Sequence, residues 1–181
     1  MRDGDATPTR DEGPPGAALR RILEATADTP GEDPLRALVR QLAAALAVRC
    51  ALVTELDGPG RARTLAFWLD GRFGQDFAYA LDGSPCEQVF AAGECWCPRG
   101  VQQQFPRDAD LVRLGLASYH GVVLRGRDGR PLGHLAVLDG RPTDPAHAPM
   151  WREVLAVLGA RAAAELERRG ERRPVNPPPS R

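Results

Sequence analysis

Residues 83–139 decide the fold, because four short motifs follow one another there. They are, in order, G-S-P-C-E-Q-V (83–89), G-V-Q-Q-Q-F-P-R-D (100–108), S-Y-H-G-V-V-L (118–124) and G-H-L-A-V-L-D (133–139). The first motif predicts a helix start, with Ser84 as the N-cap, Pro85 at the first helical position and Glu87 completing a capping box. The last two motifs predict the strands of an antiparallel hairpin about Asp128-Gly129.

Further helices are indicated by caps and by apolar periodicity. Asp33-Pro34 starts an amphipathic helix, and Asp144-Pro145 opens a long one that is predicted to end at Gly170. Gly93 is expected to end the helix that starts at Ser84, and Gly115 to end another that begins near Asp108. The apolar residues of the Asp33 helix recur at helical spacing and are Leu35, Leu38, Val39, Leu42 and Leu46. A short first helix is expected at Leu19, Ile22 and Leu23.

Two strands precede the four motifs. Residues 50–56 and 63–69 read as strands that flank the turn Asp57-Gly58-Pro59-Gly60. Strands and helices therefore occur without regular alternation. This pattern predicts an α+β fold, with helices on both sides of one antiparallel sheet.

The order and spacing of the four motifs resemble the second half of a GAF domain, a bacterial small-molecule sensing fold. The resemblance covers about residues 34–168 and implies a central antiparallel sheet of five to six strands with helices on both sides. It implies a sensory or regulatory module that binds a small molecule and signals through its terminal helices to a partner protein or within a homodimer. It does not identify the ligand, so any cofactor is unknown.

Length and composition are consistent with one domain. The 181 residues are 43% apolar, which suffices for a single core. We expect a disordered segment at 1–15, one GAF-like domain at 16–169, and a disordered tail rich in Arg and Pro at 170–181. The chain has no Lys and is rich in Ala, Gly and Pro, a bias typical of a GC-rich bacterial genome.

Charge and hydropathy exclude several classes of partner. Twenty-four acidic residues balance 24 arginines, so no net field favours nucleic acid or a membrane surface. The N-terminal residues lack the apolar core of a signal peptide, and no stretch approaches the roughly 18 apolar residues of a membrane span. We therefore expect a cytoplasmic protein whose four cysteines are thiols.

The cysteines allow two interpretations. Cys86 falls in the first turn of its helix, where free N–H groups and the helix dipole stabilise a thiolate. Cys95 and Cys97 are two residues apart and share one face of a strand. Alternatively, all are small buried hydrophobes with raised pKa values and no reactivity. Zinc is not expected, because a C-x-C pair is too tight for shared coordination.

The faces of His120 and His134 depend on the hairpin register. A five-residue loop at 126–130 pairs Arg125 with Pro131 and puts both imidazoles on one face, whereas a two-residue loop separates them. The family resemblance makes His134 structural or pocket-lining. His120 departs from the usual apolar residue at its position, and is interpreted as a polar ligand contact, a haem ligand, or a satisfied sheet histidine.

A small-molecule pocket needs apolar walls and a few polar groups. Aromatic residues cluster at 67–79, where Phe67 and Trp68 are adjacent and must point to opposite faces. The residues that we predict to line the pocket are Trp68, Cys86, Cys95, Tyr119, His120 and His134. Ordinary core packing is the alternative for each of them.

The sequence carries no hydrolase elbow, zinc-protease or phosphate-loop motif. An enzymatic alternative is a free methionine-(R)-sulfoxide reductase, which also has a GAF-like fold and a nucleophilic Cys near a helix start. Cys86 suits that role, but Leu116-Ala117-Ser118 stands where those enzymes carry another Cys. A third interpretation is a ligand-free interaction scaffold.

Overall fold

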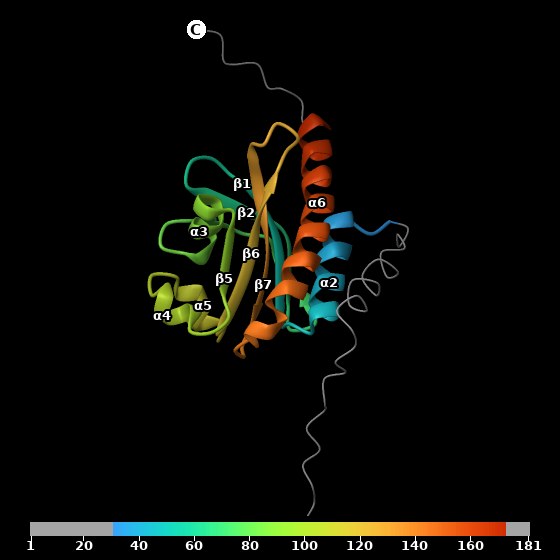
Figure 1. The fold of residues 1–181 in the computed structure, drawn as a ribbon. Helices are drawn as coiled ribbons and strands as arrows, with labels where there is room; N and C mark the ends of the chain where they lie inside the picture. The colour runs from blue at the N-terminus through green and yellow to red at the C-terminus, as the bar shows by residue number, and fades with distance from the viewer. Residues whose placement is uncertain (1–30, 173–181) are drawn as a thin grey trace, which may run out of the picture.

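The computed structural model describes residues 31–172, which form one antiparallel sheet covered by helices on both faces (Figure 1). The strand order is β3-β2-β1-β7-β6-β5, and β4 pairs separately with β2. The strands are β1 (Cys50–Leu56), β2 (Arg61–Leu69), β3 (Arg72–Phe73), β4 (Ala78–Ala80), β5 (Glu94–Cys97), β6 (Ser118–Arg125) and β7 (Pro131–Asp139). The sheet has seven strands rather than five to six, because the two- and three-residue strands β3 and β4 both pair with β2.

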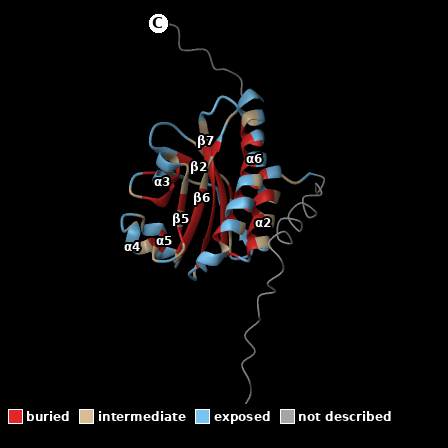
Figure 2. Ribbon diagram, viewed as in Figure 1, coloured by how far each residue is buried: buried red, intermediate tan, exposed pale blue. Residues whose placement is uncertain are grey.

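The helices divide into two layers. They are α2 (Pro34–Leu46), α3 (Pro85–Ala92), α4 (Val101–Gln104), α5 (Ala109–Arg113) and α6 (Ala148–Arg172), with a 3₁₀ turn at Pro145–His147. Helices α2 and α6 pack together on one face of the sheet, and α3, α4 and α5 lie over the other (Figure 1). Figure 2 shows the buried residues along the strands and on the sheet-facing sides of the helices. The sheet therefore separates two apolar cores.

Local capping explains where α2 and α3 begin, as predicted. Asp33 Oδ1 accepts hydrogen bonds from the backbone N–H groups of Leu35 and Arg36, at 2.9 and 3.2 Å. Ser84 Oγ accepts from the N–H of Glu87 at 3.3 Å. Glu87 Oε2 completes the box one residue early, on the N–H of Gly83 at 2.9 Å, because the N–H of Ser84 already donates to the Leu81 carbonyl.

The ends of the helices follow the sequence in part. Gly93 ends α3 in the left-handed region, with φ of 88°, as expected. Helix α6, however, continues through Gly170 to Arg172. Gly170 only weakens a helix, and one turn earlier Arg169 Nε donates to Glu165 Oε1 at 2.8 Å, so the helix is supported at this point.

Some sequence-based predictions lie outside the described residues. These are the short helix at Leu19, Ile22 and Leu23, the segment 1–15, and the tail beyond Arg172. Within residues 31–172, every helix is too short or too polar to span a bilayer.

The β6–β7 hairpin combines features of both predicted registers. Its loop has five residues, Arg125 pairs with Pro131, and the N–H of Gly126 donates to the Arg130 carbonyl at 2.9 Å. A β-bulge then shifts the register, because Leu124 pairs with Gly133 and leaves Leu132 as an extra residue. As a result His120 pairs with Val137 and His134 with Val123, so the two imidazoles lie on opposite faces.

Gly133 is required where β7 passes β1. A Cβ atom there would lie 1.8 Å from the Thr54 carbonyl oxygen, which is backbone and cannot rotate away. We expect Gly133→Ala to destabilise the fold by more than about 3 kcal/mol in urea unfolding. Gly129→Ala is the matched control: its added Cβ meets open space, so only the cost of a positive φ, about 1 kcal/mol, applies. Equal effects of the two variants would show that the close contact is unimportant.

Candidate ligand cavity

A cavity of about 70 Å³ lies between the sheet and the layer that contains α3 and α5. Strands β1, β2, β6 and β7 supply its floor, and residues of α3, α5 and the segment around β4 supply its walls. Most of its lining is apolar: Cys50, Leu52, Phe67, Phe77, Pro85, Leu111, Leu114, Leu116 and Leu138. The polar members are Tyr79, Cys86, Asp108, Asp110 and Tyr119. Such a composition is typical of a small-molecule pocket.

The Cys86 thiol is the meeting point of a buried polar chain. Tyr119 O–H and Tyr79 O–H both donate to Cys86 Sγ, at 3.5 and 3.6 Å. The Tyr79 oxygen lies 3.4 Å from His134 Nε2, and His134 Nδ1 lies 2.7 Å from Thr54 Oγ1. One tautomer satisfies every contact: Thr54 O–H donates to Nδ1, and Nε2–H donates to the Tyr79 oxygen. Each side chain in this hydrogen-bonded series thus has a partner.

Burial keeps the side chains of this hydrogen-bonded series uncharged. It lowers the pKa of His134 to about 3 and raises the pKa of Tyr119 well above its ordinary value. Burial also raises the pKa of Cys86, although the hydrogen bonds from Tyr119 and Tyr79 oppose that effect. These side chains therefore form a network of hydrogen bonds between neutral groups at neutral pH.

The other thiols are also neutral. Desolvation raises the pKa of Cys50 and of Cys95 to about 12, and that of Cys97 above its usual range. All four cysteines are buried as free thiols. Since the thiolate is the reactive form, this environment supports the unreactive interpretation of the cysteines.

Of the residues predicted to line a pocket, Cys86 and Tyr119 border this cavity. His134 lies on the same face of the sheet and reaches the cavity wall through Tyr79. Cys95 shares that face as well, but its thiol points to Gln88 Oε1, at 3.6 Å, and it does not border the cavity.

Trp68 and His120 lie on the opposite face. Trp68 packs edge-to-face on Phe73, with ring centroids 4.8 Å apart, against the α2 and α6 core. Its neighbour Phe67 is the one that borders the cavity. Because successive side chains of β2 point to opposite faces of the sheet, Phe67 and not Trp68 faces the cavity. Trp68 and His120 cannot contact a ligand in the cavity.

His120 belongs to a second buried cluster beneath α6. Its Nε2 atom lies 2.8 Å from Glu94 Oε1, which also accepts from Arg152 Nε of α6 at 2.7 Å. The imidazole stacks on Trp151 at an interplanar angle of 8° and meets Trp96 edge-on, at 4.7 Å between centroids. Desolvation lowers the pKa of His120 to about 4. His120 is therefore a buried sheet histidine that is paired through Nε2 and does not reach the cavity, and among the described residues its buried Nδ1 atom has no hydrogen-bond partner.

The sequence-based interpretation missed the wall that α5 supplies. Asp108 caps α5, and the cavity is bordered by Leu111 of that helix and by Leu114 directly after it. The only signal for them was the Asp108 cap followed by Leu111 and Leu114 one turn apart, a pattern that does not say which surface the helix covers.

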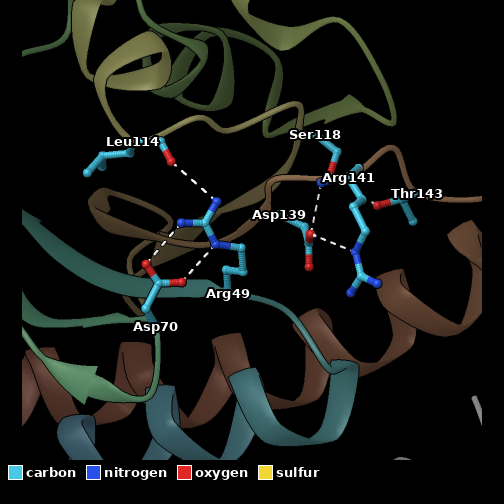
Figure 3. Close-up of polar contacts among 7 residues, drawn as sticks. All are labelled: Arg49, Asp70, Leu114, Ser118, Asp139, Arg141 and Thr143. Carbon is cyan, nitrogen blue, oxygen red and sulfur yellow. Dashed lines mark hydrogen bonds and ion pairs between the residues drawn. The ribbon is translucent and has the colours of Figure 1, made fainter. Parts of the chain in front are cut away.

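An arginine holds this wall in place at its C-terminal end (Figure 3). Arg49 makes a bidentate ion pair with Asp70, at 2.7 and 2.9 Å, and its Nη1 atom donates to the Leu114 carbonyl at 3.4 Å. Asp139 lies nearby and is buried, and its Oδ1 atom accepts from the Arg141 N–H at 2.9 Å (Figure 3). The end of α5 is thus tied to the turn between β2 and β3.

Metal binding has no support in the part of the chain that the structure describes. Residues 31–172 contain no group of three or more His, Cys, Asp or Glu side chains arranged to hold an ion.

Comparison with solved structures identifies the fold as that of a GAF domain. The GAF domain of the Acinetobacter phosphoenolpyruvate-protein phosphotransferase superposes with a TM-score of 0.65 at 21% identity, covering 87% of this chain and 95% of that one. The nlh2 GAF domain of A. aeolicus in an inactive state gives a TM-score of 0.63 at 14% identity, over 85% and 95%. The phycocyanobilin-bound GAF domain of a cyanobacterial phytochrome gives 0.60 at 12% identity, over 85% and 96%.

Sequence comparison adds no closer relative. Neither a family model nor a curated protein matches the sequence. The predicted α+β class and the GAF-like architecture are confirmed at the level of the fold.

The two buried histidines predict an acid-labile fold. Their pKa values are about 4 and about 3 when folded, against 6.5 for an ordinary histidine, so below pH 6.5 the unfolded chain binds protons that the folded chain does not. We expect the free energy of unfolding to be highest above that pH and to fall by about 1.4 kcal/mol per pH unit for each histidine as pH drops towards 4.

Urea unfolding from pH 7 to pH 4.5 measures this slope. His120→Gln keeps a donor for Glu94 and should remove the part of the slope that His120 contributes. His147→Gln, at the third histidine, is the control for replacing a histidine by glutamine, and the slope of His120→Gln is compared with its slope. A slope that His120→Gln does not alter would contradict the assignment.

Proposed function

We propose that this chain is a sensory or regulatory module that binds a small molecule in the α3–α5 cavity and transmits binding through α2 and α6. The observation that supports the proposal most is the cavity itself, apolar with a few polar groups, on the face of the sheet opposite α2 and α6. The phycocyanobilin-bound GAF domain, which shares the fold, is a ligand-bound protein. A volume of about 70 Å³ favours a much smaller ligand, because pockets for drug-sized molecules span roughly 300–1,000 Å³.

A route from the cavity to α6 runs through β6. Tyr119 borders the cavity, and the next residue, His120, stacks on Trp151 of α6. Glu94 of β5 links His120 to Arg152 of the same helix. A ligand that moves Tyr119 therefore also disturbs the contacts of α6. Such a ligand shifts the equilibrium between the two positions of Tyr119, with and without this movement, only if it binds them with different affinity.

Thiol-dependent reduction of the methionine sulfoxide type gains no support from the site. The Cys86 thiol is buried and accepts two phenol hydrogen bonds, and desolvation raises its pKa. A neutral, enclosed thiol is a poor nucleophile. The sensory interpretation is the one that the cavity favours.

Native mass spectrometry of the purified chain, beside its denatured mass and its absorption spectrum, tests for a retained ligand. We expect excess mass in the native state that is lost on denaturation. Leu52→Phe, which extends a side chain into the cavity, should abolish that excess. Val53→Ile, on the opposite face of the same strand, is the control and should keep it.

If the native mass shows no bound ligand, a thermal-shift measurement with added compounds extends the test to weakly bound ligands. Any compound that binds only the folded state raises its stability, by about 2.7 kcal/mol at a concentration 100 times the dissociation constant. Ligand sensing predicts that at least one compound of a small-molecule panel raises the melting temperature of the wild type and not that of Leu52→Phe. If no compound does so, ligand sensing is contradicted and the scaffold interpretation is favoured.

We further propose that the output reaches a second copy of the chain through α6. Ala156, Ala160 and Ala164 are exposed at four-residue spacing, so a second helix could approach this stripe closely. Ala160→Glu should leave the circular dichroism spectrum unchanged and halve the mass measured by light scattering. The control is Glu153→Gln, at another exposed position of α6, and it should keep the wild-type mass. An unaltered mass in Ala160→Glu would contradict a dimer through this face.

A further inference from the structure

Apart from the neutral Cys86 thiol, which carries one weak S–H donor, the polar side chains of the cavity lining offer mainly hydrogen-bond acceptors. The hydroxyl protons of Tyr79 and Tyr119 are directed to Cys86 Sγ, so the Tyr119 oxygen presents its lone pairs, and the Tyr79 oxygen presents the one that does not accept from His134 Nε2. Asp108 Oδ1 accepts from the N–H of Asp110 at 3.2 Å, and a carboxylate has further lone pairs. A ligand that satisfies this lining must supply donors or positive charge.

The charge of the lining is also one-sided. Asp108 and Asp110 border the cavity, and none of the lining residues is Arg or His. Asp110 is exposed and paired with Arg113 at 3.0 Å, whereas Asp108 has no ion pair within residues 31–172. Burial raises the pKa of Asp108, which is the expected result for a carboxylate that lacks a cation. The lining therefore disfavours anions.

Aromatic rings form a corner in the same lining that contains Asp108. Phe67 and Phe77 are perpendicular, with centroids 5.4 Å apart, and Tyr79 follows at 5.7 Å from Phe77 with an angle of 45°. Tyr119 adds a fourth ring to the lining. Ring faces carry negative electrostatic potential and attract cations, most strongly where water is excluded.

From these observations, and resting on the small-molecule site proposed above, we propose that the cavity binds a small organic cation, a methylated ammonium group held by Phe67, Phe77, Tyr79 and Asp108. One water needs roughly 10–15 Å³, so about 70 Å³ accommodates about five non-hydrogen atoms, the size of a trimethylammonium group with its first methylene. A polar arm on the ligand would extend towards the exposed Asp110.

Three ligands of one shape and different charge test this proposal by calorimetry on the full chain. They are choline, the neutral alcohol dimethylbutanol, in which a tert-butyl group replaces the trimethylammonium, and the anion dimethylbutanoate. We expect choline to bind at least about tenfold more tightly than the alcohol, and the anion not to bind. Equal or tighter binding of the alcohol or the anion, or no binding of choline at millimolar concentration, would overturn the cation assignment.

Variants separate the contribution of charge from that of shape. Asp108→Asn keeps an N-cap for α5 and should weaken choline about tenfold while leaving the alcohol unchanged. Asp82→Asn is the matched control, because its carboxylate pairs with Arg107 and does not border the cavity. Phe77→Leu keeps an apolar wall without a ring and should weaken choline several-fold. Equal effects of Asp108→Asn and Asp82→Asn would contradict a direct contact.

The failure of this inference is distinguishable from the failure of the sensory proposal. If the neutral alcohol or another compound binds and Leu52→Phe blocks it, the cavity is a ligand site and only the cation is wrong. If no compound of any charge produces a shift that Leu52→Phe blocks, both proposals are wrong.

Discussion

The pairing of β6 with β7 is the constraint on which the rest of the structure depends. These two strands lie between β1 and β5 in the sheet, and their buried apolar side chains enter one of two separate cores. The bulge at Leu132 fixes which residues enter which core, because one extra residue reverses the facing of β7 relative to β6. His134 thereby joins the cavity side, and His120 joins the α6 side.

This division explains why neighbouring residues have such different surroundings. Tyr119 has its hydroxyl on Cys86 and its ring over Gly121, where a Cβ atom would come within 2.4 Å of the hydroxyl oxygen. His120, one residue on, is enclosed by Trp96 and Trp151. Both rings are packed tightly, so neither can shift without moving the strand they share. The shared strand therefore places two packed clusters in contiguous contact between the cavity and the helix on the far face.

How much could be predicted from the sequence depended on the range of the interactions involved. Helix starts at Asp33 and Ser84 were predictable, because a cap involves neighbours within three residues. The strand at 50–56 was predicted with its observed bounds, and the next one begins two residues earlier than predicted. The bulge was not predictable, since it lies next to the close approach of Gly133 to Thr54, about 80 residues away in sequence. The choice of Phe67 over Trp68 likewise depends on which face of β2 meets α2.

The candidate site shows the same limit, in the thiol of Cys86. Its position in the first turn of α3 is correct, and the helix dipole there favours a thiolate by at most about 2 kcal/mol. Sequence alone could not reveal that the Cys86 sulfur is buried beside Tyr79 and Tyr119, and this burial raises the pKa of the thiol in spite of the dipole. The same arrangement directs both phenol protons to sulfur and leaves mainly acceptor lone pairs for a ligand, beside the weak S–H donor of Cys86. The burial that raises the pKa of Cys86 therefore also underlies the preference for positive charge that we propose for the cavity.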